Sequence, residues 1–152
     1  MYQSTKTYGH EVGMSCAFRQ WKANSHCNKL HGYALSFTFT FEADELDWRN
    51  WVVDFGGLKD LKATLQAYFD HKTVVAADDP HIDWFDDGAD LGVIDLIVLV
   101  DGVGCEKFAK LAFGRAKDWL ESNGCASRVK VVSVEVKEHG ANSAIYKGEM
   151  NG

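Results

Sequence analysis

Cys27 and His31 lie four residues apart, directly before a stretch in which apolar and polar residues alternate. A thiol and an imidazole at this spacing can bind a metal, activate a nucleophile, or have no chemical role. To act as a base or nucleophile, Cys27 needs a partner that lowers the pKa of its thiol. The neighbouring His26 points to the opposite side of an extended chain, so we expect that partner to come from elsewhere in the fold. The alternative is a small cysteine without a chemical role.

Three further groups of polar residues could contribute chemistry. Asp70 and His71 follow a predicted helix, where the helix dipole favours an imidazolium and a carboxylate orients the ring; the pair could also only end the helix. Glu138 continues a row of alternating valines, so its carboxylate requires a partner such as the paired N–H groups of a guanidine-like ligand. It could instead be an exposed glutamate at a strand end. Glu106 lies in the first turn of a predicted helix. Its negative charge stabilises the helix dipole there, which by itself could account for the residue.

The composition indicates one acidic domain that covers residues 1–152. The chain has 152 residues, a formal net charge of −6, 46% hydrophobic residues and one proline, which argues against disorder. An acidic balance gives no general attraction for phosphates, so we expect no nucleic-acid partner. The longest apolar run, 96–100, is too short to span a membrane, and the N-terminus lacks the apolar core of a signal peptide. We therefore expect a cytoplasmic protein without a membrane partner, whose four cysteines are thiols rather than two disulfides.

Hydrophobic periodicity predicts the elements that position these residues. Residues 4–20 are predicted as a long strand with a bulge at a glycine, and 33–42 as a half-buried strand. Residues 44–49 are predicted as a turn, and 51–53 as a short extended segment.

A helix is expected to open at residues 56–57 and to run to residue 69. A second helix is expected over 105–123, with Gly124 as its left-handed C-cap. Between the helices we expect an acidic loop over 78–92 and a short buried strand or extended segment over 96–100. Strands over 129–138 and from 144 onward complete the chain.

The predicted order is β-β-α-α-β-β, with the acidic loop and the short segment over 96–100 inserted between the two helices. Hairpins that flank paired helices indicate an α+β domain, in which a four-stranded antiparallel sheet carries two helices on one face. Such a sheet leaves its edges open. Pairing of these edges between subunits would close them, so we expect a homo-oligomer.

Six motifs, in order along nearly the whole chain, resemble those of the 6-pyruvoyl-tetrahydropterin synthase and 6-carboxytetrahydropterin synthase family. They are Cys27-x-x-Leu30-His31-Gly32, Asp54-Phe55, Asp70-His71, Glu106, Val136-Lys137-Glu138 and Ile145-Tyr146-Lys147-Gly148-Glu149. The resemblance implies the tunnelling fold (T-fold), in which two hairpins flank two helices. It also implies a hexamer of two trimers, with active sites between subunits. Residues 72–103 match the family least well.

The resemblance also implies roles for individual residues. Cys27 would be the general base, Asp70 and His71 would assist proton transfer, and Glu138 would anchor a pterin ring, with Glu106 also on the substrate side. The implied substrate is 7,8-dihydroneopterin triphosphate or a related reduced pterin. The implied reaction loses the triphosphate and rearranges the side chain, in queuosine, 7-deazaguanine or pterin metabolism.

The chain departs from the family at the metal site. The family binds zinc through three histidines, but Phe18 stands at the first of these positions and Tyr33 at the third, which leaves His31 alone. One imidazole does not hold zinc usefully. Cys16, two residues before Phe18 on the same strand face, could rebuild a shifted site with His31 and a third group. The candidates for that third group are His26, Cys27 and His10.

The sequence therefore leaves three functional hypotheses. The first is a diverged 6-carboxytetrahydropterin synthase-like lyase that acts on a reduced pterin. The second is a non-catalytic pterin- or purine-binding protein of the same fold that lacks zinc. The third discards the resemblance and predicts a thiol-dependent enzyme built on Cys27 and His71 alone.

Overall fold

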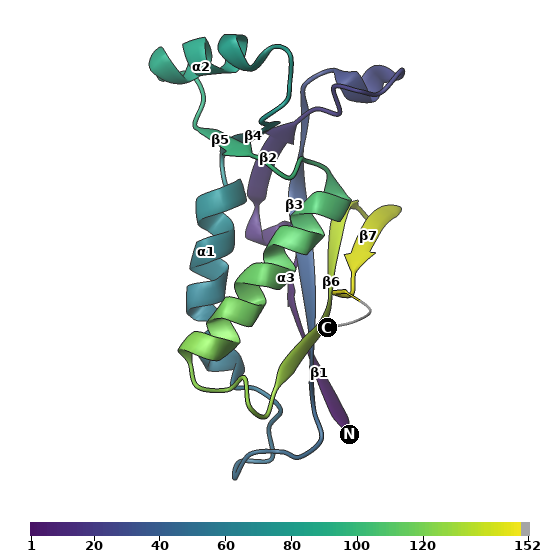
Figure 1. Ribbon diagram of the computed structural model, residues 1–152, viewed down its shortest axis with the longest axis vertical. Coiled ribbons are helices and arrows are strands. Elements are labelled where there is room, and N and C mark those ends of the chain that lie inside the picture. Colours follow the sequence, from purple (N-terminus) through teal and green to yellow (C-terminus); the bar gives the residue numbers. More distant parts are fainter. Residues whose placement is uncertain (150–152) are drawn as a thin grey trace.

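The computed structural model describes residues 1–149, and its sheet is built around one long strand, β3 (His31–Ala43). β1 (Tyr2–Tyr8) pairs antiparallel with the second half of β3, and β2 (Met14–Phe18) pairs antiparallel with the first half. β6 (Lys130–His139) lies antiparallel along the other edge of β3, and β7 (Asn142–Tyr146) forms a hairpin with β6 (Figure 1). The two predicted hairpins are therefore present.

The predicted first strand is interrupted near a glycine, as expected. A short 3-10 helix, η1 (His10–Val12), separates β1 from β2, and Gly13 follows it with φ +74°. A left-handed conformation of this kind favours glycine, because a side chain would be strained there. The interruption lets β1 and β2 both pair with β3 as two halves of one edge.

The prediction of a four-stranded sheet was wrong in strand number. β4 (Lys72–Ala76) follows the first helix and pairs parallel with β2, and β5 (Leu96–Leu99) pairs parallel with β4. The full sheet has seven strands, in the order β5-β4-β2-β3-β6-β7, with β1 also on β3. The predicted antiparallel part is intact, and two parallel strands extend one of its edges.

Three smaller predictions also differ from the structure. The acidic segment expected as a loop contains the helix α2 (Ile82–Asp90), which is held by the buried ring of Phe85. β5 is only partly buried, with Val98 44% exposed, because it lies at the sheet edge. Residues 51–53 form a bend rather than an extended segment.

Two helices, α1 (Lys59–Phe69) and α3 (Cys105–Ser122), cover one face of the sheet as predicted (Figure 1). α1 is preceded by a 3-10 turn, η3 (Phe55–Leu58), rather than opening directly at the two glycines. The predicted left-handed C-cap of α3 at Gly124 is confirmed by its φ of +70°. No helix among residues 1–149 combines the length and apolar character needed to cross a membrane.

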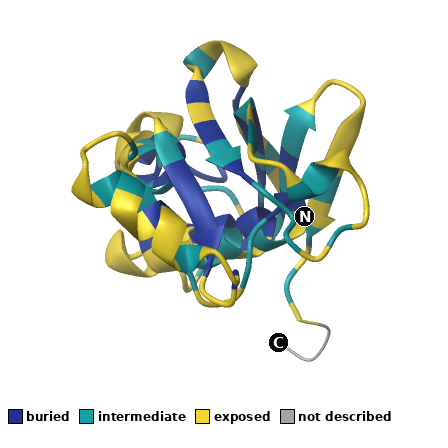
Figure 2. Cartoon of the chain, turned by 90° about the horizontal axis from the view of Figure 1, so that it is seen from above, coloured by how far each residue is buried: buried dark blue, intermediate teal, exposed yellow. Residues whose placement is uncertain are grey.

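The core lies between these helices and β3. Phe37, Phe39 and Phe41 point from β3 into this layer and are fully buried. The ring of Phe69 on α1 lies 5.1 Å from that of Phe37 and 5.0 Å from that of Phe108 on α3. Figure 2 shows buried residues gathered where helices and sheet face each other, with exposed residues on the outer sides. The aromatic layer therefore fixes the position of both helices on the sheet.

Replacing Phe69 by alanine should lower the free energy of unfolding by about 3–5 kcal/mol, because it removes the ring that joins α1, β3 and α3. Phe55, which is 46% exposed, provides the matched control, and Phe55→Ala should cost less than about 1 kcal/mol. Urea unfolding followed by circular dichroism measures both values. Equal losses in the two variants would contradict the described core.

Candidate functional site

Four polar side chains meet where β3 begins and β6 ends. Tyr33 lies on β3, Cys27 in the preceding loop, Glu138 near the end of β6 and Cys105 at the start of α3. The carboxylate of Glu138 opposes ionisation of both the Tyr33 hydroxyl and the Cys105 thiol, and Cys27 and Cys105 lie near enough to influence the ionisation of Tyr33 as well. We call these four residues the Tyr33 cluster. The structure thus brings together Cys27 and Glu138, which lie 111 positions apart in the sequence.

Local hydrogen bonds hold Cys27 in this position. It is the middle residue of a 3-10 turn, η2 (His26–Asn28), and its N–H donates to the Ser25 hydroxyl at 3.3 Å. Its carbonyl accepts the N–H of Gln20 at 2.9 Å, which ties the turn to the end of β2. The Cys27 backbone is therefore fixed at the edge of the sheet.

Glu138 follows a row of valines on β6 that is shorter than expected. Val134 and Val136 are fully buried, and Glu138, two residues further along, is partly buried. An irregularity in the pairing with β3 shifts the alternation, so that Val131 rather than Val132 is buried. A second irregularity, in the pairing with β7, lies between Lys137 and His139 and leaves Glu138 outside the regular ladder.

Cys105 and Tyr33 are parts of the cluster that sequence analysis did not assign to it. Cys105 is the first residue of α3, and Gly104 before it has φ +110°. A Cβ on Gly104 would lie 2.1 Å from Nε2 of Gln20, which donates to the Val103 carbonyl at 3.2 Å. Glycine is required there, because the chain must pass close to this side chain before the helix starts. Glu106, in the same first turn, lies close enough to act on the Cys105 thiol.

The environment keeps three groups at this end of the sheet protonated at neutral pH. Burial and then the carboxylates of Glu138 and Glu106 raise the pKa of Cys105 to about 12. Burial and the neighbouring Cys105 raise the pKa of Cys16 to about 12. Burial, followed by Glu138 and the two thiols, also raises the pKa of Tyr33.

Asp70 and His71 form the predicted pair, at the start of β4. Nδ1 of His71 lies 2.7 Å from Oδ1 of Asp70, and the His71 side chain is 83% exposed. The His71 backbone has φ +58°, and its N–H donates to the carbonyl of Ser15 at 2.7 Å. Cys16, next to Ser15, pairs with Tyr33 on β3 and with Lys72 on β4. The pair therefore lies where β4 begins, with β2 between it and β3.

Three rings meet at the positions where the family resemblance implies zinc-binding histidines. The ring centroid of Phe18 lies 5.3 Å from that of His31 and 6.1 Å from that of Tyr33, and the centroids of His31 and Tyr33 are 5.5 Å apart. Nδ1 of His31 lies 2.6 Å from the Lys29 carbonyl, and phenylalanine offers no lone pair to a metal. The residues present thus do not fit a zinc site made of three imidazoles.

The alternative metal site built on Cys16 does not form among residues 1–149 either, since no three His, Cys, Asp or Glu side chains there are placed to share a metal ion. The Cys16 side chain is 1% exposed, and its raised pKa disfavours the thiolate that a metal requires. Nδ1 of His10 instead contacts the Ala34 carbonyl at 2.5 Å. All four cysteines are free thiols, as predicted.

The Tyr33 cluster can bind a planar ligand and move a proton. The carboxylate of Glu138 can accept two parallel N–H groups of a heterocycle. The Tyr33 hydroxyl and the Cys105 thiol are neutral donors next to it. Cys27, which also lies near Tyr33, is the cluster member whose thiol could take a proton from a bound molecule.

Comparison with known proteins identifies relatives over nearly the full chain. A family model described as 6-pyruvoyl tetrahydropterin synthase matches residues 9–149. A 6-carboxy-5,6,7,8-tetrahydropterin synthase from Aquifex aeolicus is 28% identical over 160 residues, which cover 97% of this chain and 99% of that protein.

Solved structures show the same fold. An uncharacterised protein from Wolinella succinogenes superposes with a TM-score of 0.81 at 21% identity, over 97% of this chain and 98% of that one. The 6-pyruvoyl tetrahydropterin synthase of Plasmodium falciparum gives a TM-score of 0.68 at 15% identity, over 99% and 100% of the two chains. The predicted α+β tunnelling fold is confirmed, with β4 and β5 as additions to the predicted sheet.

The raised pKa values predict which thiols react. At pH 8, Cys16 and Cys105 should resist iodoacetamide, because a thiol with a pKa of about 12 is ionised to about one part in ten thousand. Cys125 is partly exposed and should be alkylated. Peptide mass mapping after a timed reaction measures this pattern, and all four cysteines should react in denaturant. Labelling of Cys16 or Cys105 as fast as Cys125 in the folded protein would refute the described environment.

Proposed function

The chain belongs to the 6-pyruvoyl tetrahydropterin synthase family, and on that premise we propose that it is a 6-carboxytetrahydropterin synthase-like lyase. Its substrate in this proposal is 7,8-dihydroneopterin triphosphate or a related reduced pterin. The family match and the Aquifex aeolicus relative support a pterin-metabolism lyase of the tetrahydropterin synthase type. The observation that carries the proposal is the meeting of Cys27 and Glu138 around Tyr33.

In this proposal Glu138 orients the pterin ring. The amino group and the adjacent ring N–H of a pterin form two parallel donors, which match the two oxygens of a carboxylate. The Cys105 thiol, whose pKa Glu138 raises, lies next to the carboxylate that would accept such donors. Glu106 and the start of α3 then border the same ring.

Cys27 acts as the general base in the proposed reaction. Its thiolate takes a proton from a carbon of the substrate side chain, and the electron pair of that C–H bond expels the triphosphate as the C–O bond breaks. The side chain then rearranges. In this proposal Asp70 and His71 of a neighbouring subunit receive or return protons, and the 83% exposed side chain of His71 leaves the ring accessible for that role. The proposed site then lies between subunits of a homo-oligomer, a hexamer of two trimers.

A second function follows from the rings that replace the zinc ligands. Phe18 is buried and packs edge-on against Phe108 at 5.2 Å, so it belongs to the core as much as to the site. A protein of this kind could bind a reduced pterin or a purine through Glu138 without the family's metal chemistry. In this second proposal the protein is a non-catalytic pterin-binding member of the family.

Replacing Glu138 by glutamine should weaken binding of 7,8-dihydroneopterin by about 2–3 kcal/mol, or roughly thirty- to one-hundred-and-fifty-fold in Kd, because the NH₂ group that replaces one oxygen cannot accept the second of two parallel N–H groups. Glu135→Gln is the matched control, since Glu135 lies on β6 but bonds to Ser143 on the other side of the strand. Pterin fluorescence titration measures binding, and triphosphate release measures turnover of 7,8-dihydroneopterin triphosphate. Glu138-dependent binding without turnover would favour the non-catalytic function, and equal affinities of the two variants would refute both proposals.

The purified protein should contain substoichiometric zinc, because Phe18 and Tyr33 cannot complete a three-imidazole site with His31. The double variant Phe18→His and Tyr33→His should gain tight zinc binding, since it supplies two imidazoles next to the existing one. Elemental analysis after dialysis against a weak chelator compares the two proteins. Stoichiometric zinc in the unchanged protein would show that another set of ligands holds the metal.

A further inference from the structure

Two residues that follow β2, Arg19 and Gln20, hold the turn that carries Cys27. Nη1 of Arg19 donates to the carbonyl of Asn28 at 3.0 Å. The backbone N–H of Gln20 donates to the carbonyl of Cys27, the residue before Asn28, at 2.9 Å. Two consecutive peptide groups of the turn are therefore fixed to the same end of β2, and with them the backbone from which the Cys27 thiol extends.

The guanidinium of Arg19 also binds Asp79, in the segment between β4 and α2. Its Nε and Nη2 donate to the two carboxylate oxygens at 2.8 Å and 2.9 Å, which makes the pair bidentate. The Asp79 side chain is only 1% exposed, so solvent screens the pair weakly. The same carboxylate accepts the backbone N–H of His81, the N-cap residue of α2, at 2.9 Å. Arg19 therefore joins the Cys27 turn to the start of α2.

Both members of this ion pair are charged at neutral pH. The hydrogen bond from Arg19 lowers the pKa of Asp79, burial opposes this effect, and the N–H of His81 adds to the lowering. The hydrogen bond to Asp79 likewise raises the pKa of Arg19. Removal of Arg19 would leave the buried Asp79 carboxylate unpaired and would threaten the fold. Replacement of Arg19 by lysine keeps the charge, but a compact ammonium does not reproduce the fork that reaches Asp79 and the Asn28 carbonyl together.

Residues 72–103, between α1 and α3, reach the Cys27 turn at two places. Asp79 does so through Arg19. Val103 does so through Gln20, whose Nε2 donates to the Val103 carbonyl at 3.2 Å. Both acceptors thus lie in the part of the chain that matches the family motifs least. This segment is more than an addition to the sheet, because it braces the end of β2 that holds Cys27.

We propose that Arg19 is a positioning residue for Cys27, held in place by Asp79. A base that takes a proton from carbon must lie about 3–3.5 Å from the reacting atom, and a misplacement of about 1 Å can cost roughly hundred-fold in rate. Arg19 fixes the carbonyl one residue beyond Cys27 and thereby limits such movement. This role rests on the proposed lyase function, because Cys27 is the base of that reaction. An ion pair with a structural role alone would affect stability but not kcat.

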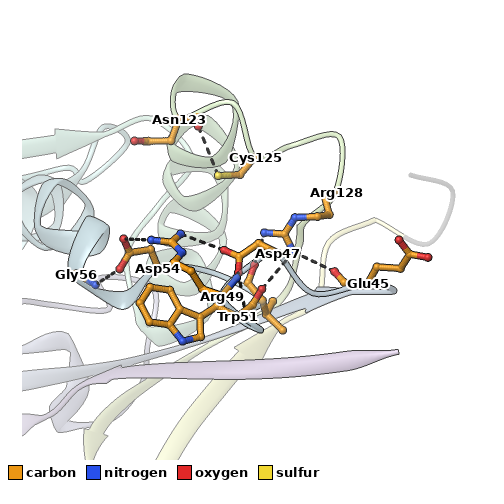
Figure 3. Close-up of polar contacts among 10 residues, drawn as sticks. Glu45, Asp47, Arg49, Trp51, Asp54, Gly56, Asn123, Cys125 and Arg128 are labelled. Atoms are coloured by element: carbon orange, nitrogen blue, oxygen red, sulfur yellow. Dashed lines mark hydrogen bonds and ion pairs between the residues drawn. The ribbon is translucent and has the colours of Figure 1, made fainter.

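Turnover of 7,8-dihydroneopterin triphosphate by the Arg19→Lys variant tests this role. Measured by triphosphate release, kcat should fall roughly ten- to hundred-fold and KM should change by less than about two-fold, because the binding of the ring is untouched. Arg49→Lys is the matched control and should keep the kcat of the unchanged protein. The Arg49 guanidinium also joins two carboxylates, those of Asp47 and Asp54 (Figure 3). It lies in the loop after β3, at the opposite end of that strand from Cys27 (Figure 1).

Amide hydrogen exchange followed by NMR provides a second readout, which needs no turnover. The amides of Asn28 and Lys29 donate to carbonyls at the start of the turn at 3.1 Å and 2.9 Å, and in Arg19→Lys they should exchange roughly ten-fold faster than in Arg49→Lys. If the unchanged protein is active, equal kcat values for the two variants, or a fall in kcat without faster exchange, would overturn the positioning role alone. Absence of turnover in the unchanged protein would refute the lyase function, and this role with it.

Discussion

The pairing of β3 along both of its edges is the constraint on which the rest of the structure depends. On one edge Tyr33 faces Cys16 and His31 faces Phe18, and on the other Phe37 faces Val136. A slip of one residue would turn every side chain of β3 to the opposite face. The buried phenylalanines of β3 oppose such a slip, because they would then leave the core for the surface. The same register carries Tyr33 to Glu138, so the packing of the core and the assembly of the candidate site have one cause.

The parts of this fold that follow from local pattern could be predicted from the sequence. The alternation that starts at Tyr33 identified β3, and Gly124 marked the end of α3. β4 was missed because five residues directly after a helix carry no period of their own, and their parallel pairing with β2 exists only in the tertiary structure. α2 was missed because aspartates dominate its sequence, whereas the burial of Phe85 holds it in place.

In the candidate site, too, some features follow from residue type and local pattern, and others exist only in the tertiary structure. Cys27 and Glu138 were identified from residue type, position and family resemblance, and the structure places them around one tyrosine. The contribution of Cys105 depends on where the start of α3 meets the end of β6, and no sequence spacing specifies that meeting. The irregularity that buries Val131 in place of Val132 was not predicted, because it arises from pairing with β3. The position of Asp70 and His71 at the start of β4, held by the hydrogen bond from the His71 N–H to Ser15, is likewise a property of the fold.

α3 begins beside the candidate site, where Glu138 raises the pKa of Cys105, the first residue of the helix. A crystal structure of the assembled protein with bound 7,8-dihydroneopterin is the most direct test of the central claim. It should show the N–H edge of the pterin on the carboxylate of Glu138, with Cys27 and Tyr33 beside the side chain and no metal on His31. A pterin bound away from Glu138, or a metal ion held by His31, would contradict the account.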